Sequence, residues 1–299
     1  GFDIDPLAVM LAKVNWVVSN RDWLGELDGS RKVAPPIYNA DSLFALAPVF
    51  ADHSDDDPDL PYSIRMHDRE VQLPRLLVSP GMQSLFDGIL SGAYHLGMHV
   101  AHHGHLSDIT TERTERVVKE AASDSGTPVD EADMTSIRDF VLDFSVALAE
   151  LEHAGKNGVW AFLVGNAYRP GLVAAQFNGL ISNPPWLAMS RLQDNPFGPV
   201  LQARAEAFDL VPSGSAFLHL EMATVFLAHA VNFYLADNAV IGCVLPDTTR
   251  QGAQHQSFRD QILGYDNAAL PIDILPTSLW KVSKGTFKNQ SVVLFGVKG

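Results

Sequence analysis

The segment best suited to chemistry is Asn183-Pro184-Pro185-Trp186, here called the NPPW box, which follows a short apolar run at 177–182. That run is predicted to be a strand of an α/β sheet, and ligands of such sheets bind just beyond the carboxyl ends of the strands. Two prolines fix φ and remove backbone donors, which stiffens the loop and leaves its carbonyls available. Asn183 supplies a neutral acceptor and Trp186 a flat face. The box therefore suits a planar heterocycle that bears an exocyclic amine.

The reaction that such a site favours follows from the electronic structure of an aromatic amine. Its lone pair is delocalised into the ring, so the nitrogen is a poor nucleophile. Two acceptors, the Asn183 side-chain oxygen and the Pro184 carbonyl, would favour a more tetrahedral nitrogen and direct its lone pair at a sulfonium methyl. These contacts strengthen in the transition state and so raise the rate. Holding the reactants in line contributes about 7–11 kcal/mol.

The NPPW box resembles the fourth motif of S-adenosylmethionine-dependent amino-methyltransferases, and further segments resemble other motifs of this family in the same order. The start of the chain, residues 1–9, resembles the second motif, and residues 39–43 resemble the third. Residues 158–162, together with Tyr168-Arg169-Pro170, are similar to segments of the large, restriction-associated members of this methyltransferase family. Residues 239–246 resemble a later strand that ends in Leu-Pro, and Gly285-Thr286-Phe287 resembles the eighth motif.

The resemblance implies a role for each matching side chain. Asp3 would bind the ribose hydroxyls of the cofactor, and Ile4 would pack on its adenine. Asp41 would accept from the adenine amine, and the neighbouring Ser42 belongs to the same cofactor-binding group. Phe287 would help to hold the flipped base, while Asn183, Pro184, Pro185 and Trp186 would form the catalytic corner.

The implied activity is transfer of a methyl group from S-adenosylmethionine to the N6 amine of adenine in double-stranded DNA, with the base flipped out of the duplex. Asn at the first position of the box favours adenine, since by resemblance cytosine-N4 enzymes more often carry Ser there. A restriction-modification or phage-defence system is the expected setting. Restriction or specificity subunits or domains are the expected further partners.

Two alternatives stay open at this point. Boxes of the same type also occur in enzymes that methylate RNA bases or protein glutamine, although those enzymes tend to be compact with Tyr at the fourth position. A non-catalytic methyltransferase-like module is the other alternative. This alternative is favoured because the glycine loop of the first motif, which would stand just before Gly1, is absent from this sequence. We therefore expect the chain to be a piece of a longer protein, without a complete cofactor pocket.

The elements that must position the box are predicted to be those of an α/β fold with a Rossmann-like methyltransferase sheet. A strand at 2–4, a helix capped by Asp5 with Pro6 in its first turn, and a strand at 36–39 open the chain. They are predicted to form an α/β unit with parallel strands and a helix with many buried faces. Residues 1–44 and 158–299 would form the catalytic domain, with a mainly helical insertion at 45–157 between the third- and fourth-motif strands. Helices are predicted at 82–96, 108–122, 131–154, 158–175, 216–235 and 251–263. Later strands are predicted at 239–245, which should be fully buried, and at 271–275 and 291–297.

Composition limits the remaining classes of function. The net charge of −14 is unusual for a nucleic-acid enzyme, because phosphate contacts need clustered Lys and Arg, so a basic DNA-binding region is expected elsewhere in a longer protein. The single cysteine, Cys243, is predicted to be a core residue and fits a reducing compartment. No apolar run is long enough for a membrane span and no signal peptide is seen, so no membrane partner and a cytoplasmic location are predicted.

A group of histidines also has the density of a metal site, but no Cys or ordered set of carboxylates stands near it. We therefore interpret it as a solvated or partner-facing patch and predict no metal. Its members are His95, His99, His102, His103 and His105.

Overall fold

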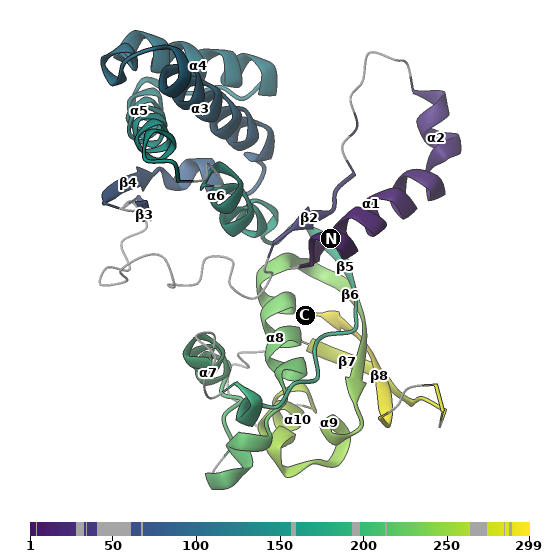
Figure 1. Ribbon diagram of the computed structural model, residues 1–299. Helices are drawn as coiled ribbons and strands as arrows, with labels where there is room; N and C mark the ends of the chain where they lie inside the picture. The colour runs from purple at the N-terminus through teal and green to yellow at the C-terminus, as the bar shows by residue number, and fades with distance from the viewer. Residues whose placement is uncertain are drawn as a thin grey trace. The chain divides into compact units, whose positions relative to one another are not determined.

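The computed structural model describes residues 1–3, 5–27, 33, 35–40, 61–66, 68–156, 160–192, 198–212, 214–263, 274–283, 285–286 and 289–299. The protein is a mixed α/β structure with two compact units, Gly1–Leu172 and Val173–Gly299 (Figure 1). None of the helices within these ranges combines the length and the apolar composition needed to cross a bilayer.

The first unit begins with a strand–helix–strand segment: β1 (Phe2–Asp3), α1 (Pro6–Ser19), α2 (Arg21–Glu26) and β2 (Tyr38–Asn39). The two strands pair in parallel, as predicted. Asp5 caps α1 by accepting from the Leu7 amide at 2.8 Å, and Pro6 occupies the first turn, which confirms the predicted start. The expectation that many faces of α1 are buried is wrong, since only Val9 is buried. α1 packs against β1, β2 and α2.

Three helices, α3 (Gln83–His103), α4 (Thr111–Ser125) and α5 (Glu131–His153), lie side by side and form the core of the first unit (Figure 1). Asp130 caps α5 by accepting from the Asp133 amide, and Gly126 ends α4 with a left-handed φ of 67°. The α5 residues spaced for one helical face are all buried, as predicted: Ile137, Phe140, Val141, Phe144, Leu148 and Leu151. A short 3-10 turn, η3 (Leu106–Asp108), joins α3 to α4.

A β-hairpin precedes these helices, in a part of the predicted insertion to which no element was assigned. Strands β3 (Tyr62–Met66) and β4 (Arg69–Leu73) pair antiparallel, with Ile64 opposite Val71. Alternate residues of both strands are buried and join the core of the helices. A period of two over only five residues is the strand signal that the longer helical pattern downstream obscured. The 3-10 helix η2 (Arg75–Val78) leads from the hairpin to α3.

In place of one helix over 158–175, the structure has α6 (Trp160–Tyr168) and η4 (Arg169–Val173), and the first unit ends within η4 at Leu172. Pro170 has no amide hydrogen, so an α-helical bond cannot form at that position. Val164, Tyr168 and Leu172 belong to the same hydrophobic core as α3 and α5, so this core continues to the end of the unit. Burial raises the pKa of Tyr168 to about 12.

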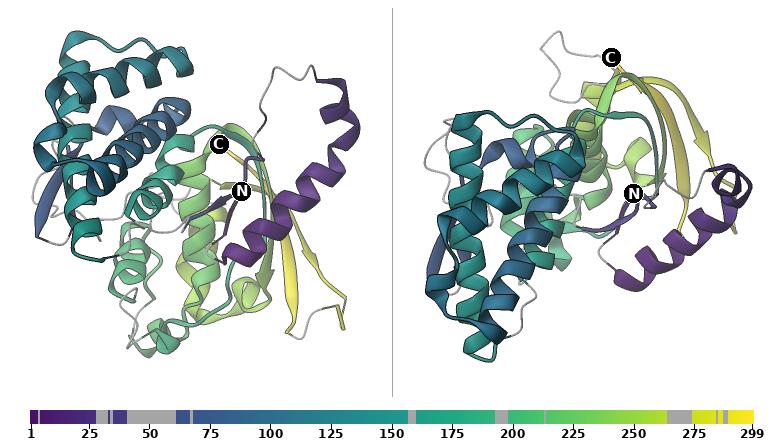
Figure 2. Two further views of the ribbon diagram at one scale, coloured as in Figure 1. Left: turned by 45° about the horizontal axis from the view of Figure 1, so that its top comes forward. Right: turned by 90° about the horizontal axis from the view of Figure 1, so that it is seen from above.

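The second unit contains a four-stranded mixed sheet in the order β5-β6-β8-β7 (Figure 2). Its strands are β5 (Phe177–Ser182), β6 (Leu235–Pro246), β7 (Ile274–Lys281) and β8 (Ser291–Lys298). β5 and β6 pair in parallel, whereas β8 pairs antiparallel with both β6 and β7. The strands predicted at 177–182, 239–245 and 291–297 are confirmed. The strand predicted at 271–275 is described only from Ile274 and continues to Lys281.

The two faces of β6 differ, although the strand was predicted to be buried throughout. Ala239, Ile241, Cys243 and Leu245 are buried, whereas Val240 is 61% exposed. Alternate side chains of a strand point to opposite faces, and α8 (Met222–Tyr234) packs against β6 on the buried one (Figure 2). The core position of Cys243 is confirmed, and burial raises the pKa of its thiol to about 12.

The helix predicted over 216–235 is interrupted. A 3-10 segment, η6 (Gly214–His219), is followed by extended backbone at Glu221, and α8 begins only at Met222. The helix predicted at 251–263 is likewise divided into α9 (Thr248–Gln251), η7 (Ala253–His255) and α10 (Gln256–Leu263). The remaining elements are η5 (Met189–Arg191) and α7 (Gly198–Ala207).

Candidate functional site

The NPPW box lies directly after the carboxyl end of β5. Ser182 is the last residue of that strand and pairs with Cys243 of the parallel strand β6, so both strands end at the same edge of the sheet. Asn183 and Pro185 are exposed, Pro184 is buried, and Trp186 is half-buried. The buried Pro184 fixes the loop to the unit, while the amide of Asn183 is accessible to a ligand at the edge where ligands of parallel strands bind.

The chain beyond the box is fixed by a second set of backbone hydrogen bonds. The Met189 amide donates to the Leu220 carbonyl, and the Met222 amide donates to the Leu187 carbonyl, each at 2.9 Å. Ala188 and Glu221 form an isolated antiparallel bridge between these bonds. The box is therefore held by β5 on one side and by this bridge on the other. The bridge is also the reason that the predicted helix is interrupted at Glu221, because the backbone there is extended to pair with the loop.

The side chain of Glu221 is the centre of a hydrogen-bonded network next to this bridge. Its Oε2 accepts from Thr248 Oγ1 at 2.5 Å and lies 2.9 Å from Nε2 of His255, whose side chain is fully buried. An ionised carboxylate can only accept, so Nε2 of His255 carries the hydrogen that faces it. Nδ1 of the same ring lies 3.3 Å from Thr224 Oγ1.

The environment of Glu221 favours its ionised form. Burial raises the pKa of this carboxyl, but the hydrogen bonds from His255 and Thr248 and the contact with His255 together outweigh burial, so the pKa lies below its usual value. The carboxylate is therefore charged at neutral pH, and it keeps its acceptor role towards both partners.

A second carboxylate, Asp247, follows the carboxyl end of β6. Its side chain is only 8% exposed and lies 3.0 Å from Arg250 Nε and 3.9 Å from Lys281 Nζ. The Asp247 amide donates to the Gln290 carbonyl at 3.0 Å, which ties this loop to the residue before β8. Because its charge is balanced by two cations, we assign Asp247 to the support of the sheet edge rather than to proton transfer.

No sequence motif pointed to Glu221, Asp247, Thr248 or His255. Two signals were available. Glu221 is an acidic residue inside the apolar run 216–235, and Asp247 directly follows a buried strand. His255 stands in a polar stretch without any periodic or motif signal, and only the fold brings it to Glu221.

In the first unit, Asp3 lies at the carboxyl end of the parallel pair β1 and β2. Its Oδ1 accepts from the Asp5 amide at 2.8 Å, and its carbonyl accepts from the Ala40 amide and from Asn39 Nδ2. The carboxylate is exposed, so it remains accessible to hydroxyl donors of a ligand. Four other predicted site residues, Ile4, Asp41, Ser42 and Phe287, lie outside the described residues.

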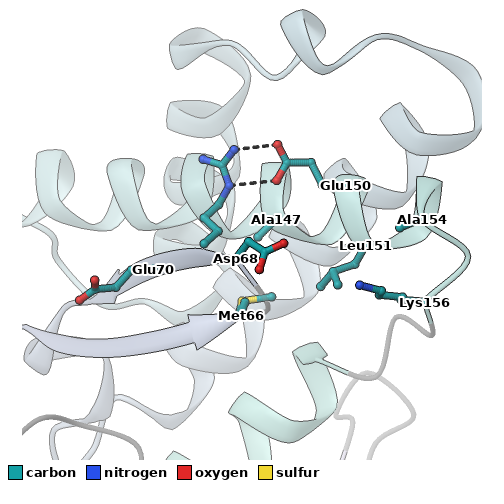
Figure 3. A pocket seen from close by; sticks show the side chains of 9 residues that line it. Met66, Asp68, Glu70, Ala147, Glu150, Leu151, Ala154 and Lys156 are labelled. Carbon is teal, nitrogen blue, oxygen red and sulfur yellow. Dashed lines mark hydrogen bonds and ion pairs between the residues drawn. The ribbon is translucent and has the colours of Figure 1, made fainter.

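A cavity of about 430 Å³ opens in the first unit between the β3–β4 hairpin and α5 (Figure 3). Arg69 makes two hydrogen bonds to Glu150 there, at 2.7 and 3.1 Å, and these raise the pKa of the guanidinium. The described residues that line the cavity include no aromatic side chain. With its arginine already paired and no flat surface for a heterocycle, the cavity does not fit the chemistry of the NPPW box.

The histidine patch lies on α3 and the turn that follows it, and its side chains are exposed. The rings of His99 and His103 are 5.5 Å apart, and His102 Nε2 lies 3.1 Å from Glu152. Within the described ranges, no three or more His, Cys, Asp or Glu side chains are placed to share a metal ion.

Comparison of the chain with protein-family models, with curated proteins and with solved structures found no match.

Proposed function

We propose that this chain is part of the catalytic domain of an S-adenosylmethionine-dependent methyltransferase that acts on the N6 amine of adenine in DNA. The observation that carries the proposal is the NPPW box at the end of β5, with Asn183 exposed and the loop bonded beyond Trp186 through Leu187 and Met189. Electrostatic catalysis requires acceptors that are already in place before the reaction, and a loop held on both sides provides this.

Three residues of the box have defined roles in the proposed reaction. The Asn183 side-chain oxygen and the Pro184 carbonyl accept the two hydrogens of the adenine amine, and Trp186 stacks on the purine. S-adenosylmethionine, when bound, would supply the methyl group from a positively charged sulfur, which would leave with the bonding pair as the amine nitrogen takes the methyl carbon. The methylated nitrogen then releases one proton to water.

The cofactor and base contacts are proposed from the resemblance together with the position of Asp3. Its exposed carboxylate at the end of β1 supports binding of two neighbouring hydroxyls, as on a ribose. Ile4, Asp41 and Ser42 complete the proposed cofactor contacts, and Phe287 the contact to the base. The proposal includes a Rossmann-like catalytic domain at 1–44 and 158–299, a helical insertion at 45–157, a cytoplasmic location and a role in restriction-modification or phage defence.

The proposal is tested by transfer of radiolabelled methyl groups to duplex DNA by the full-length protein. Asn183→Ala should abolish transfer and leave the dissociation constant of the cofactor nearly unchanged. Asn178→Ala is the matched control, since Asn178 is exposed on the same strand, β5. Trp186→Ala should weaken binding of the flipped base by about 1–3 kcal/mol. Retained turnover in the Asn183 variant contradicts the proposal.

The same assay distinguishes the alternatives. Methylation of ribosomal RNA or of a release-factor protein in place of DNA would keep the chemistry and change the substrate. A full-length protein that binds no S-adenosylmethionine would be a non-catalytic module. Asp3→Ala should weaken binding of the cofactor without changing the product, and unchanged affinity would contradict the ribose role.

A further inference from the structure

We infer that Glu221 is a positioning residue for the NPPW box, which it connects to the loop after β6 and to the buried His255. The inference rests on the proposed methyltransferase function. The backbone of Glu221 pairs with Ala188, two residues beyond Trp186. Its carboxylate accepts from Thr248, the second residue after the end of β6. One residue thus joins the loops that follow the two parallel strands.

His255 fixes the direction of the carboxylate. Its ring is fully buried and lies between Glu221 Oε2, at 2.9 Å from Nε2, and Thr224 Oγ1, at 3.3 Å from Nδ1. Thr224 is in the first turn of α8, so the ring is held from the same helix that Glu221 precedes. A buried ring with a partner on each nitrogen limits the rotation of the carboxylate.

Position matters here because the box acts through geometry and not through a titrating group. A displacement of about 1 Å in a catalytic site can reduce the rate about a hundredfold. Thr248 offers a mild way to loosen the connection, since its side chain is exposed and its hydroxyl donates to Glu221. Loss of that hydroxyl leaves the contact between His255 and Glu221 in place.

The test compares steady-state methyl transfer by full-length variants. Thr248→Val should lower kcat about tenfold, with the KM for S-adenosylmethionine unchanged, whereas Thr248→Ser, which keeps the hydroxyl, should retain kcat. Glu221→Gln should lower kcat at least as much as Thr248→Val. Glu206→Gln is the matched control, because Glu206 is an exposed carboxylate of the same unit that accepts from Gln202.

The outcomes separate this inference from the proposed function. If Asn183→Ala is inactive while Thr248→Val keeps the parent kcat, Glu221 does not position the box and only the inference is overturned. If Asn183→Ala is also fully active, the proposed function is overturned as well. A change in the cofactor KM without a change in kcat likewise overturns the inference. Should Glu221→Gln show no cooperative melting transition, the pair of Thr248 variants decides.

Discussion

Substitution of Met222 by proline perturbs the support of the NPPW box at a single hydrogen bond. Met222 is the first residue of α8, a position that proline favours, and Glu221 before it has φ −95° and ψ 140°, which suit a residue that precedes proline. The helix should therefore tolerate the change. The Met222 amide, however, donates to the Leu187 carbonyl, and proline replaces this amide hydrogen with a ring carbon.

The expected cost in stability is small. Loss of one backbone hydrogen bond costs about 0.5–1.5 kcal/mol. Proline also restricts the unfolded chain, which returns about 0.4–1 kcal/mol. The free energy of unfolding should therefore change by less than about 1 kcal/mol. The loop must still move, because the ring carbon occupies the place of the hydrogen.

Two measurements can detect a displaced loop in a protein whose global stability is nearly unchanged. Hydrogen exchange of the Met189 amide, which donates to Leu220 in the same bridge, should become at least about tenfold faster in Met222→Pro, equivalent to about 1.4 kcal/mol of local stability. In the full-length protein, kcat for methyl transfer should fall by about 10- to 100-fold. Met222→Ala is the control, because it shortens the same side chain and keeps the amide.

If Met222→Pro accelerates exchange at Met189 and yet transfers methyl groups at the parent rate, the position of the box does not limit the reaction and this prediction is wrong. Equal losses of kcat in Met222→Pro and Met222→Ala would assign the effect to the side chain and not to the bridge.

Two further predictions concern stability. At Gly97 an added Cβ would lie 2.7 Å from the Ser145 carbonyl of α5, so Gly97→Ala should destabilise the first unit by about 1–3 kcal/mol in urea unfolding. Gly165→Ala is the control: its added Cβ would meet only Leu90 Cδ1 at 3.4 Å, so this variant should be neutral or stabilising. Because the folded-state pKa of Glu221 is lowered, its contribution to stability is present above pH 4.5 and is lost as the pH falls through its folded-state pKa. The free energy of unfolding should therefore depend less on acid pH in Glu221→Gln, and an unchanged pH dependence would contradict the assignment.

Local sequence was sufficient for the elements with strong periodicity and for their ends. The face of α5 from Ile137 to Leu151, the cap at Asp5 and the strand before the NPPW box all depend on residues within a few positions of one another. Such signals act through backbone preference and through one buried face, and both can be read without knowledge of distant contacts.

Distant packing decided the remaining features. The β3–β4 hairpin is short, and its alternating residues are buried only because the helical core lies against them. The continuous apolar pattern from 216 to 235 favours one helix, yet the backbone pairs with Ala188 and the helix stops at Glu221. The backbone bonds to the loop compete there with helical bonds of the same kind, and the sequence pattern of the helix carries no information about that competitor.

The chemical character of the strand edge was thus present in the order Asn-Pro-Pro-Trp, because residue type sets which donors, acceptors and flat faces a loop can offer. The support of that loop could not be predicted from the sequence. Glu221 and His255 are 34 positions apart, and their hydrogen bond exists only after β6 and α8 have packed. A hydrogen bond between distant side chains has no period along the chain, so only the tertiary structure identifies it.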